Sequence, residues 1–435
     1  MYKRMKHFIV TFFFLLTIIF TAKAQTGTWS GKLDVQGAKL TLIFHLDEEN
    51  PTVDSPDQGA KGIPVQIERP VAGSIKVNVP SIGATYEGTW IGQQIVGTLK
   101  QGGASLPLTL KQGVEKLNRP QTPKEPFPYA QEAVSFTNGD AVLKGTLVLP
   151  KGYDRQTPVL VMVTGSGLQN RDEEIFEHKP FAVIADAFAR AGIATLRYDD
   201  RGYGESTGEL VSMTTEDIKN DALAGVKLLR ERFDKVGVVG HSEGGSIALM
   251  LAADKQVDFI VSLAGMVVSG KETLLWQNRT ILAALGFSQE AIDIYCKVLD
   301  EAFDARINEG QMPSADGLNL PEALKSNFTA VLAQLQTPYM QYFLALDLRS
   351  RLSEIACPVL AVNGTKDTQV DAESNLDALR KGLPQNGKNK IEAAEGLNHL
   401  FQHCKTGGTN EYKEIEETFA PEILEMMTQW ILTIK

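Results

Sequence analysis

A serine held between glycines, directly after a short apolar run, is the feature that most constrains this chain. The pentapeptide Gly240-His241-Ser242-Glu243-Gly244 follows the run Val236–Val239, and a helix is expected to begin near Gly245. Small residues on both sides of the serine permit a sharp strand-to-helix turn, which lifts the hydroxyl above the edge of a sheet. The bare motif arises by chance in many chains, but in this strand–turn–helix context it predicts that Ser242 is a nucleophile.

A serine hydroxyl is a weak nucleophile near neutral pH, so it needs a base oriented by a third group. The predicted base is His399, because the segment Gly396–His399 lies just beyond the last expected strand and can return over the serine. His403 is its competitor, with a solvated helix surface as the alternative role. We expect His241 to point away from the serine, and we interpret His45 as structural because it lies in a different domain.

The third member of the predicted triad is an aspartate. In this architecture the acid lies between the serine and the histidine in chain order. Asp367 follows the apolar run Val359–Val362 and occupies its exit turn. From that position a carboxylate can hold the imidazole tautomer and stabilise the imidazolium. Aspartate is also favoured in turns for local reasons, but together with Ser242 and His399 it is predicted to be catalytic.

Acyl transfer also needs backbone N–H groups that stabilise the oxyanion of the tetrahedral intermediate. The residue after the nucleophile, Glu243, is expected to supply one N–H. The second donor is expected in the loop Thr164–Leu168, which follows the run Val159–Val163. Ser166 is the first choice for this donor and Gly167 is the second.

The region from residue 130 to residue 435 alternates strand-like and helical segments. Such alternation predicts a mostly parallel α/β sheet flanked by helices, and dense Val, Ile and Leu content suits strands covered on both faces. Residues 268–352 interrupt the alternation with helical sequence and are expected to form a cap. The expected strands are Ala141–Leu149, Val159–Val163, Ala194–Tyr198, Val236–Val239, Phe259–Leu263, Val359–Val362 and Lys390–Ala393.

Residues 25–114 have a different pattern, with apolar residues at every second position and glycine turns between short runs. This period of two predicts a small all-β domain, a barrel or a sandwich. Trp29 and Trp90 flank turns and are interpreted as core residues, with sugar stacking as the alternative. Prolines recur between residues 115 and 129, where they exclude a helix or a central strand and predict a linker.

The first 24 residues have the order of a secretory signal peptide. Basic residues precede the apolar run Phe8–Phe20, and Ala22-Lys23-Ala24 resembles a cleavage site. We therefore expect an exported protein, periplasmic or extracellular, without a membrane span after cleavage. A retained anchor is the alternative, but the run is shorter than the roughly 20 residues that a spanning helix needs.

Composition excludes several classes of function. A formal charge of −10 argues against a nucleic-acid partner, because phosphate binding requires a basic surface. The three cysteines, Cys296, Cys357 and Cys404, are too few for a disulfide scaffold, although one bridge stays open. None of them has metal-ligand spacing, so no metal site is expected.

The charged segment Arg197–Ser206 is interpreted as structural. Its charges are expected to pair with one another, or with Arg171 and Asp172, and to brace loops beside the site.

These motifs resemble those of the α/β-hydrolase superfamily of serine hydrolases, and within it those of exported bacterial esterases related to the serine aminopeptidase and dienelactone hydrolase groups. The resemblance covers about residues 130–435. It rests on Gly165–Gly167 with Arg171-Asp172, Asp199–Ser206, Gly240–Gly245, Asn363–Val370, Gly396–Gln402 and the cap segment Thr337–Phe343. It implies an α/β-hydrolase fold and hydrolysis of carboxylic esters through an acyl-enzyme, without metal or organic cofactor. The loop Thr164-Gly165 departs from the His-Gly of many lipases.

We therefore expect a carboxylesterase that acts on small-molecule esters with small or medium acyl chains. A serine peptidase, of aminopeptidase or prolyl type, uses the same triad and is the first alternative. A protein whose β domain binds glycan or cell wall is the second alternative. Because one fold serves many substrates, the sequence leaves the acyl-chain preference and the oligomeric state open.

Overall fold

The computed structural model describes residues 26–434 except residues 36, 37, 48, 59, 115 and 315. The expected signal peptide at residues 1–24 therefore lies outside the described residues. The chain divides into two units, Met1–Lys116 and Leu117–Lys435. Among the residues described, no helix has both the length and the apolarity that crossing a membrane requires.

The first unit is a single nine-stranded sheet in the order β4-β3-β2-β1-β9-β8-β7-β6-β5, and its paired strands are antiparallel. Alternating apolar residues bury one face of each strand, as the period of two predicts. The strands are β1 (Thr28–Val35), β2 (Ala38–His45), β3 (Thr52–Ser55), β4 (Ala60–Pro64), β5 (Gln66–Glu68), β6 (Ser74–Val79), β7 (Ala84–Ile91), β8 (Gln94–Gln101) and β9 (Ala104–Gln112).

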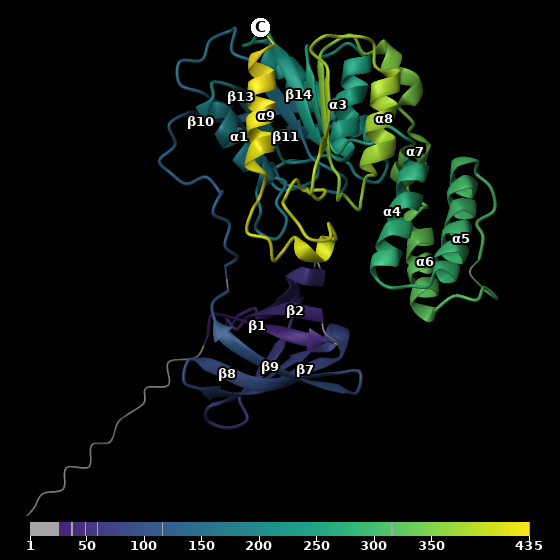
Figure 1. Cartoon of the computed structure of the whole chain (residues 1–435). Coiled ribbons are helices and arrows are strands. Elements are labelled where there is room, and N and C mark those ends of the chain that lie inside the picture. The colour runs from purple at the N-terminus through teal and green to yellow at the C-terminus, as the bar shows by residue number, and fades with distance from the viewer. Residues whose placement is uncertain are drawn as a thin grey trace, which may run out of the picture. The chain divides into compact units, whose positions relative to one another are not determined.

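This sheet curls around its own core (Figure 1). Val53, near one edge of the strand order, and Ile75, near the other, belong to the same buried cluster as Phe44 and Leu108. Tyr86 lies at the centre of the cluster, and its hydroxyl donates to the carbonyl oxygens of Ile95 and Leu108 at 3.0 and 3.1 Å. A curled sheet can thus enclose a core without a second sheet.

The second unit contains an eight-stranded sheet in the order β10-β11-β13-β12-β14-β15-β16-β17. The pairs β10–β11 and β11–β13 are antiparallel, and the remaining pairs are parallel. The α/β-hydrolase fold expected above is confirmed, with one strand more than predicted, β10. The strands are β10 (Ala130–Asn138), β11 (Ala141–Leu149), β12 (Val159–Val163), β13 (Ala194–Tyr198), β14 (Val236–His241), β15 (Ile260–Leu263), β16 (Val359–Gly364) and β17 (Lys390–Ala394).

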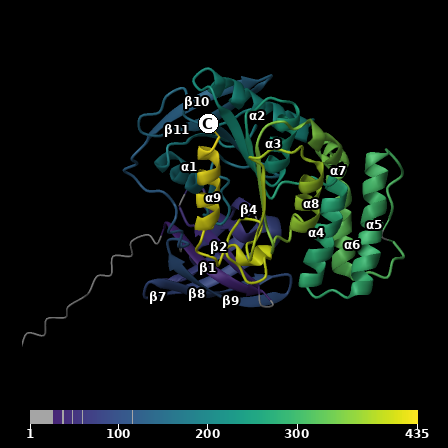
Figure 2. The same ribbon diagram turned by 45° about the horizontal axis from the view of Figure 1, so that its top comes forward.

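Helices cover both faces of this sheet (Figures 1 and 2). On one face, α1 (Pro180–Arg190) and α9 (Pro421–Leu432) pack against β12, β15 and β16. On the other face, α2 (Thr215–Arg230), α3 (Glu243–Ala253) and α8 (Ala372–Gly382) enclose the larger core cluster. The central strands are therefore buried on both sides, which explains their almost uniformly apolar sequence.

A helical cap lies between β15 and β16, at the place expected for it. It comprises α4 (Gly270–Ala284), α5 (Gln289–Ile307), α6 (Glu322–Gln334), α7 (Pro338–Ala345) and the 3₁₀ helix Arg349–Glu354. In both overall views α4, α5 and α6 stand together on the side of α8 (Figures 1 and 2). The cap has its own core, which includes Tyr295, Phe303 and Phe328. Cys296, in this core, is a free thiol, as are Cys357 and Cys404.

The proline-rich segment from Leu117 to Tyr129 is attached to the second unit by side-chain hydrogen bonds. The Arg119 guanidinium donates to the carbonyl oxygens of Phe176, Lys413 and Ile415 at 2.7 to 3.1 Å. Gln121 adds bonds to the backbone of Thr418 and Phe419. Each of these contacts is internal to the second unit, so the segment forms part of its surface.

Candidate active site

Ser242 occupies a strained turn between β14 and α3. Its backbone has φ +55° and ψ −120°, a conformation that costs free energy for a residue with a side chain. The flanking glycines make the turn sterically feasible: a Cβ at Gly240 would lie 1.9 Å from the Gly244 carbonyl oxygen, and a Cβ at Gly244 would lie 2.1 Å from that of Val163. The local geometry is that of a nucleophile elbow.

Asp367 and His399 meet at the ends of neighbouring parallel strands, β16 and β17. His399 Nδ1 lies 2.7 Å from Asp367 Oδ2, and both residues are buried. Asp367 Oδ1 accepts from the N–H groups of Gln369 and Val370 at 2.7 and 3.0 Å, which fixes the carboxylate. Because a carboxylate only accepts, Nδ1 carries the proton and Nε2 is the nitrogen that can take up another.

The loop that carries His399 lies against the residue before the serine. His241 Nε2 is 2.8 Å from the His399 carbonyl oxygen, and the two ring centroids are 4.6 Å apart. Within the part of the chain that the structure describes, no hydrogen bond joins the Ser242 hydroxyl to the His399 ring. Catalytic hydrogen bonds are often long without substrate and shorten in the reacting complex.

His403, the competing base, lies at the surface. Its Nδ1 and Nε2 are 2.9 and 3.0 Å from carboxylate oxygens of Glu417 and Glu422, and 57% of its side chain is exposed. The hydrogen bond to Glu417 raises the pKa of His403. Of the two candidate bases, the structure brings only His399 to Asp367.

The loop after β12 lies beside the serine. A Cβ on Gly165 would be 3.1 Å from the Ser242 Cβ, so only glycine fits there without movement. The Ser166 hydroxyl donates to Glu243 Oε2 at 2.7 Å. The backbone N–H groups of Ser166 and Glu243 have no hydrogen-bond partner among the residues described.

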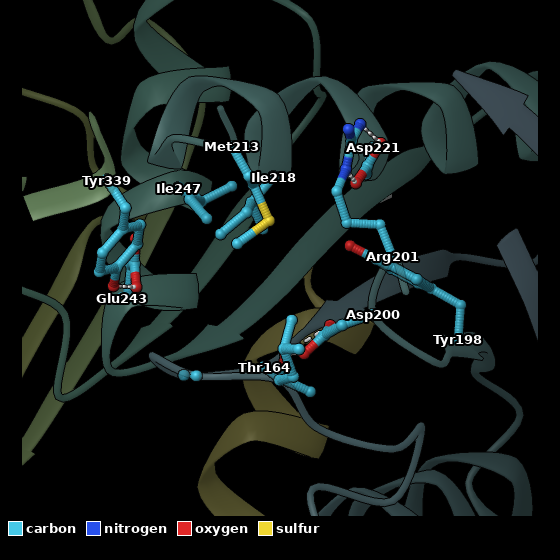
Figure 3. A pocket seen from close by; sticks show the side chains of 13 residues that line it. Thr164, Tyr198, Asp200, Arg201, Met213, Ile218, Asp221, Glu243, Ile247 and Tyr339 are labelled. Carbon is cyan, nitrogen blue, oxygen red and sulfur yellow. Dashed lines mark hydrogen bonds and ion pairs between the residues drawn. The ribbon is translucent and has the colours of Figure 1, made fainter. Parts of the chain in front are cut away.

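The Glu243 side chain joins this site to the cap. Its carboxylate is buried and accepts from Ser166 and from Thr215 Oγ1, the latter at 2.7 Å. It also accepts from the Tyr339 hydroxyl at 2.5 Å (Figure 3). Burial is the main cause that raises the pKa of Tyr339, followed by the charge of Glu243. Tyr339, in α7, is stacked on Phe343 with ring centroids 5.8 Å apart. The cap thus contacts the residue after the nucleophile directly.

A cavity of about 130 Å³ borders the elbow on this side (Figure 3). Its lining includes Gly165 and Glu243 next to the serine, but not Ser242 or His399 themselves. Asp200 also lines it and accepts from Thr164 Oγ1 at 2.9 Å and from the Gln169 N–H at 2.8 Å. Burial raises the pKa of Asp200 to about 8. Among the described residues, no cation pairs with Asp200 or with Glu243.

Most charges of the segment Arg197–Ser206 are paired. Arg171 binds both Asp199, at 2.7 Å, and Glu205, and Arg197 binds Asp172, as expected. Arg201 binds Asp221 at 2.6 Å, which lies outside the expected set of partners.

One feature of the site escaped sequence analysis. Glu173 is buried and bonds both His241 and the Gly165 N–H, so it belongs to the site. No local pattern distinguishes it, because its partners are distant in the sequence. Among the residues described, no cluster of His, Cys, Asp and Glu is arranged to hold a metal ion.

Comparison with known proteins places this geometry in a family. Residues 138–404 match the family model described as X-Pro dipeptidyl-peptidase (S15 family). The esterase EstD of Thermotoga maritima is 28% identical over 266 residues, which cover 60% of this chain and 58% of that esterase.

Two solved structures are similar at lower identity. Est1E from Butyrivibrio proteoclasticus has a TM-score of 0.41 at 17% identity, covering 69% of this chain and 98% of that one. A dienelactone hydrolase from Anabaena variabilis has a TM-score of 0.41 at 18% identity, covering 70% and 98%. Since the family model spans more than half of the sequence, the chain belongs to the X-Pro dipeptidyl-peptidase (S15) family of α/β-hydrolases.

Proposed function

We propose that the protein is a serine hydrolase that cleaves carboxylic esters with small or medium acyl chains through an acyl-enzyme. The observation that carries this proposal is the buried Asp367–His399 hydrogen bond of 2.7 Å beside the strained Ser242. The similarity to an esterase of Thermotoga maritima supports the ester as substrate. We further propose that the protein acts after export, as the pattern of residues 1–24 suggests, and that the reaction needs no cofactor.

In the proposed mechanism, His399 Nε2 takes the hydroxyl proton while Ser242 Oγ attacks the ester carbonyl carbon. The resulting oxyanion accepts hydrogen bonds from the N–H groups of Glu243 and Ser166. The C–O bond to the alcohol then breaks, and the alcohol leaves with the proton from His399. Water attacks the acyl-enzyme in the same way, with His399 as base, and the carboxylic acid leaves. Asp367 keeps the ring in the required tautomer and stabilises its protonated form.

A peptidase is the second candidate, and one observation favours it. Among the residues described, no cation pairs with the carboxyls of Asp200 and Glu243 in the cavity beside the elbow, while Asp221 in the same cavity is paired with Arg201. A protonated substrate amine bound there would supply the missing charge and would draw Asp200 into its ionised form. The name of the family, X-Pro dipeptidyl-peptidase, agrees with a substrate that has a free amino terminus.

The test compares wild type with Ser242→Ala. We expect the variant to lose hydrolysis by several orders of magnitude and to lose labelling by a fluorophosphonate, while its circular dichroism is unchanged. Ser246→Ala is the matched control, because Ser246 lies on the same helix with its hydroxyl bonded to the Met266 carbonyl oxygen. Strong labelling of Ser242→Ala would show that another serine reacts.

A substrate panel separates the two candidates. It contains p-nitrophenyl acetate, butyrate and octanoate, and Ala-Pro-p-nitroanilide with and without an N-acetyl group. An esterase hydrolyses the p-nitrophenyl esters, and acetylation of the anilide does not change its kcat/KM. A peptidase of the second kind has the higher kcat/KM for the anilide with a free amine and loses it on acetylation.

A further inference from the structure

Glu173 and His241 link the three segments that hold the proposed catalytic groups. One oxygen of the buried Glu173 carboxylate, Oε1, lies 2.9 Å from Gly165 N and 2.9 Å from His241 Nδ1. The other nitrogen of the His241 ring lies 2.8 Å from the His399 carbonyl oxygen. A continuous series of hydrogen bonds therefore runs from the oxyanion loop, through the residue before Ser242, to the loop of the base.

The partners of His241 define the protonation state of its ring. A carboxylate oxygen and a backbone carbonyl oxygen face the two ring nitrogens, so a ring that donates from both nitrogens satisfies both contacts. Burial acts against the positive charge of such a ring, but the charge and hydrogen bond of Glu173 and the His399 carbonyl oxygen outweigh it and raise the pKa of His241. Asp367 adds attraction from the side of His399. Phe181, Leu400 and Phe419 line the same small cavity as His241, and the His399 ring lies 4.6 Å from the His241 ring.

The loop that carries Glu173 is held in an unfavourable backbone conformation. Glu173, Phe176 and Glu177 have φ values of +53°, +48° and +61°, in the left-handed region that non-glycine residues seldom adopt. Such a conformation persists only where surrounding contacts impose it. The bonds of Glu173 to Gly165 and His241 are contacts of this kind.

We infer that Glu173 and His241 are a positioning pair, which sets the distance between the oxyanion loop and the base loop on either side of Ser242. The inference rests on the proposed function of Ser242 and His399. Neither member of the pair is required to touch the substrate, so their effect on the reaction passes through Gly165 and the His399 backbone. Displacement of a reacting group by about 1 Å can cost about 100-fold in rate, so the loss of this link is expected to be visible in kcat.

His178 provides a comparison within the same chain. It is also buried, and its ring binds Thr418 Oγ1 and the Tyr412 carbonyl oxygen, each at 2.9 Å. A hydroxyl can donate or accept, so this ring needs only one proton, and burial lowers the pKa of His178 to about 4. A buried histidine can thus hold two segments together without a carboxylate. The charged pair at His241 is a distinct arrangement at the catalytic loops.

The first test is Glu173→Gln, which keeps the size of the side chain and an oxygen acceptor. Without the negative charge the buried ring loses its second proton, so it can no longer donate to both residue 173 and the His399 carbonyl oxygen. We expect kcat for p-nitrophenyl acetate to fall about 10- to 100-fold, with KM changed less than about threefold. His178→Asn is the control, and it should lower thermal stability while kcat stays within about twofold of wild type.

A double variant tests whether the two residues act as a unit. In Glu173→Gln/His241→Gln, the glutamine at 241 can still donate to the His399 carbonyl oxygen. If the pair acts as a unit, the double variant is less impaired than the product of the two single losses. Multiplicative losses would contradict the coupling.

Ser242→Ala is measured first. If this variant keeps the activity of wild type, the proposed function fails, and that result is distinct from a failure of the inference about Glu173 and His241. Given that dependence, a folded Glu173→Gln with kcat within twofold of wild type overturns the inference. An equal fall of kcat in His178→Asn also overturns the inference. If Glu173→Gln does not fold, the inference is tested by ¹⁵N NMR of histidine-labelled wild type, which reports the protonation state of the His241 ring. A doubly protonated His241 ring at pH 7 supports the inference, and a singly protonated ring overturns it.

Discussion

Replacement of Asp367 by asparagine is expected to reverse the tautomer of His399. Asp367 Oδ1 accepts from two backbone N–H groups, those of Gln369 and Val370, while Oδ2 accepts from the ring. In the variant the amide oxygen must keep the position that faces the two N–H groups, which places the NH₂ group against His399 Nδ1. Two donors cannot face each other, so the proton moves to Nε2, and the ring can no longer act as base toward Ser242.

The alternative amide orientation is less favourable. It would place the NH₂ group against the two backbone N–H groups and leave both without an acceptor in a buried site, at a cost of about 1–3 kcal/mol each. The tautomer change is therefore the expected response. In a Ser-His-Asp enzyme of different fold the wrong tautomer lowers kcat by about 10⁴, equivalent to roughly 5.5 kcal/mol of barrier. We expect a loss of that order here.

The assay is the initial rate of p-nitrophenyl acetate hydrolysis by wild type, Asp367→Asn and Asp367→Ala. The alanine variant leaves no donor facing Nδ1, so Asp367→Asn should be at least as impaired as Asp367→Ala. Asp371→Asn serves as the control, because Asp371 caps α8 through a bond from the Ser374 N–H and asparagine caps equally well. Retention of more than a tenth of the wild-type kcat by Asp367→Asn would refute the proposed role of this hydrogen bond.

Four further predictions follow from the site and the fold. His399→Ala should lose nearly all hydrolysis, whereas His403→Ala should keep most of it, and the reverse order in kcat would reassign the base. A chain that begins at Leu117 should fold and hydrolyse p-nitrophenyl acetate, since its contacts to residues 413–419 are retained; insoluble or inactive protein would show that the first unit is required. The folded-state pKa of Asp200, about 8, lies above its unfolded value of about 3.9, so its contribution to the unfolding free energy is complete below pH 3.9 and is lost as the pH rises toward 8. Denaturant titrations at pH 5 and pH 8 should show this loss in wild type and not in Asp200→Asn. Tyr339→Ala, which enlarges the cavity beside the elbow, should change the relative kcat/KM among acetate, butyrate and octanoate esters by about 10- to 200-fold; an equal loss for all three esters would instead indicate a role in cap packing.

The features that sequence analysis predicted are those with a strong local pattern. The elbow of Ser242 is a serine between glycines directly after an apolar strand, and Asp367 and His399 each follow a recognisable strand. Because the carboxyl ends of parallel strands meet at one edge of the sheet, a correct strand list was enough to bring the loops of Asp367 and His399 together. The cap was predicted from the interruption of strand–helix alternation, and the structure has helices throughout that interval.

Other features depend on contacts that no local pattern shows. Strand β10 was missed because it pairs with β11 alone, and only Phe136 of its nine residues is buried. The proline-rich segment gave no sign that Arg119 would bind three carbonyl groups, because those groups lie about 60 and 300 residues further along the chain. The role of Glu173 was missed for the same reason, since Glu173 reaches His241 only through a loop with residues in left-handed conformation.

The two residues on either side of Ser242 direct their side chains to opposite faces of the sheet. His241 points to the face covered by α1, where it contacts Glu173 and the backbone of His399. Glu243 points to the opposite face, where α2 supplies Thr215 and the cap supplies Tyr339. Because both residues are fixed by the turn that strains Ser242, one short segment relates the base loop, the oxyanion loop and the cap. The Tyr339 hydroxyl is one of three donors to the carboxylate of Glu243, whose N–H is a proposed oxyanion donor, so the cap contributes to fixing this residue.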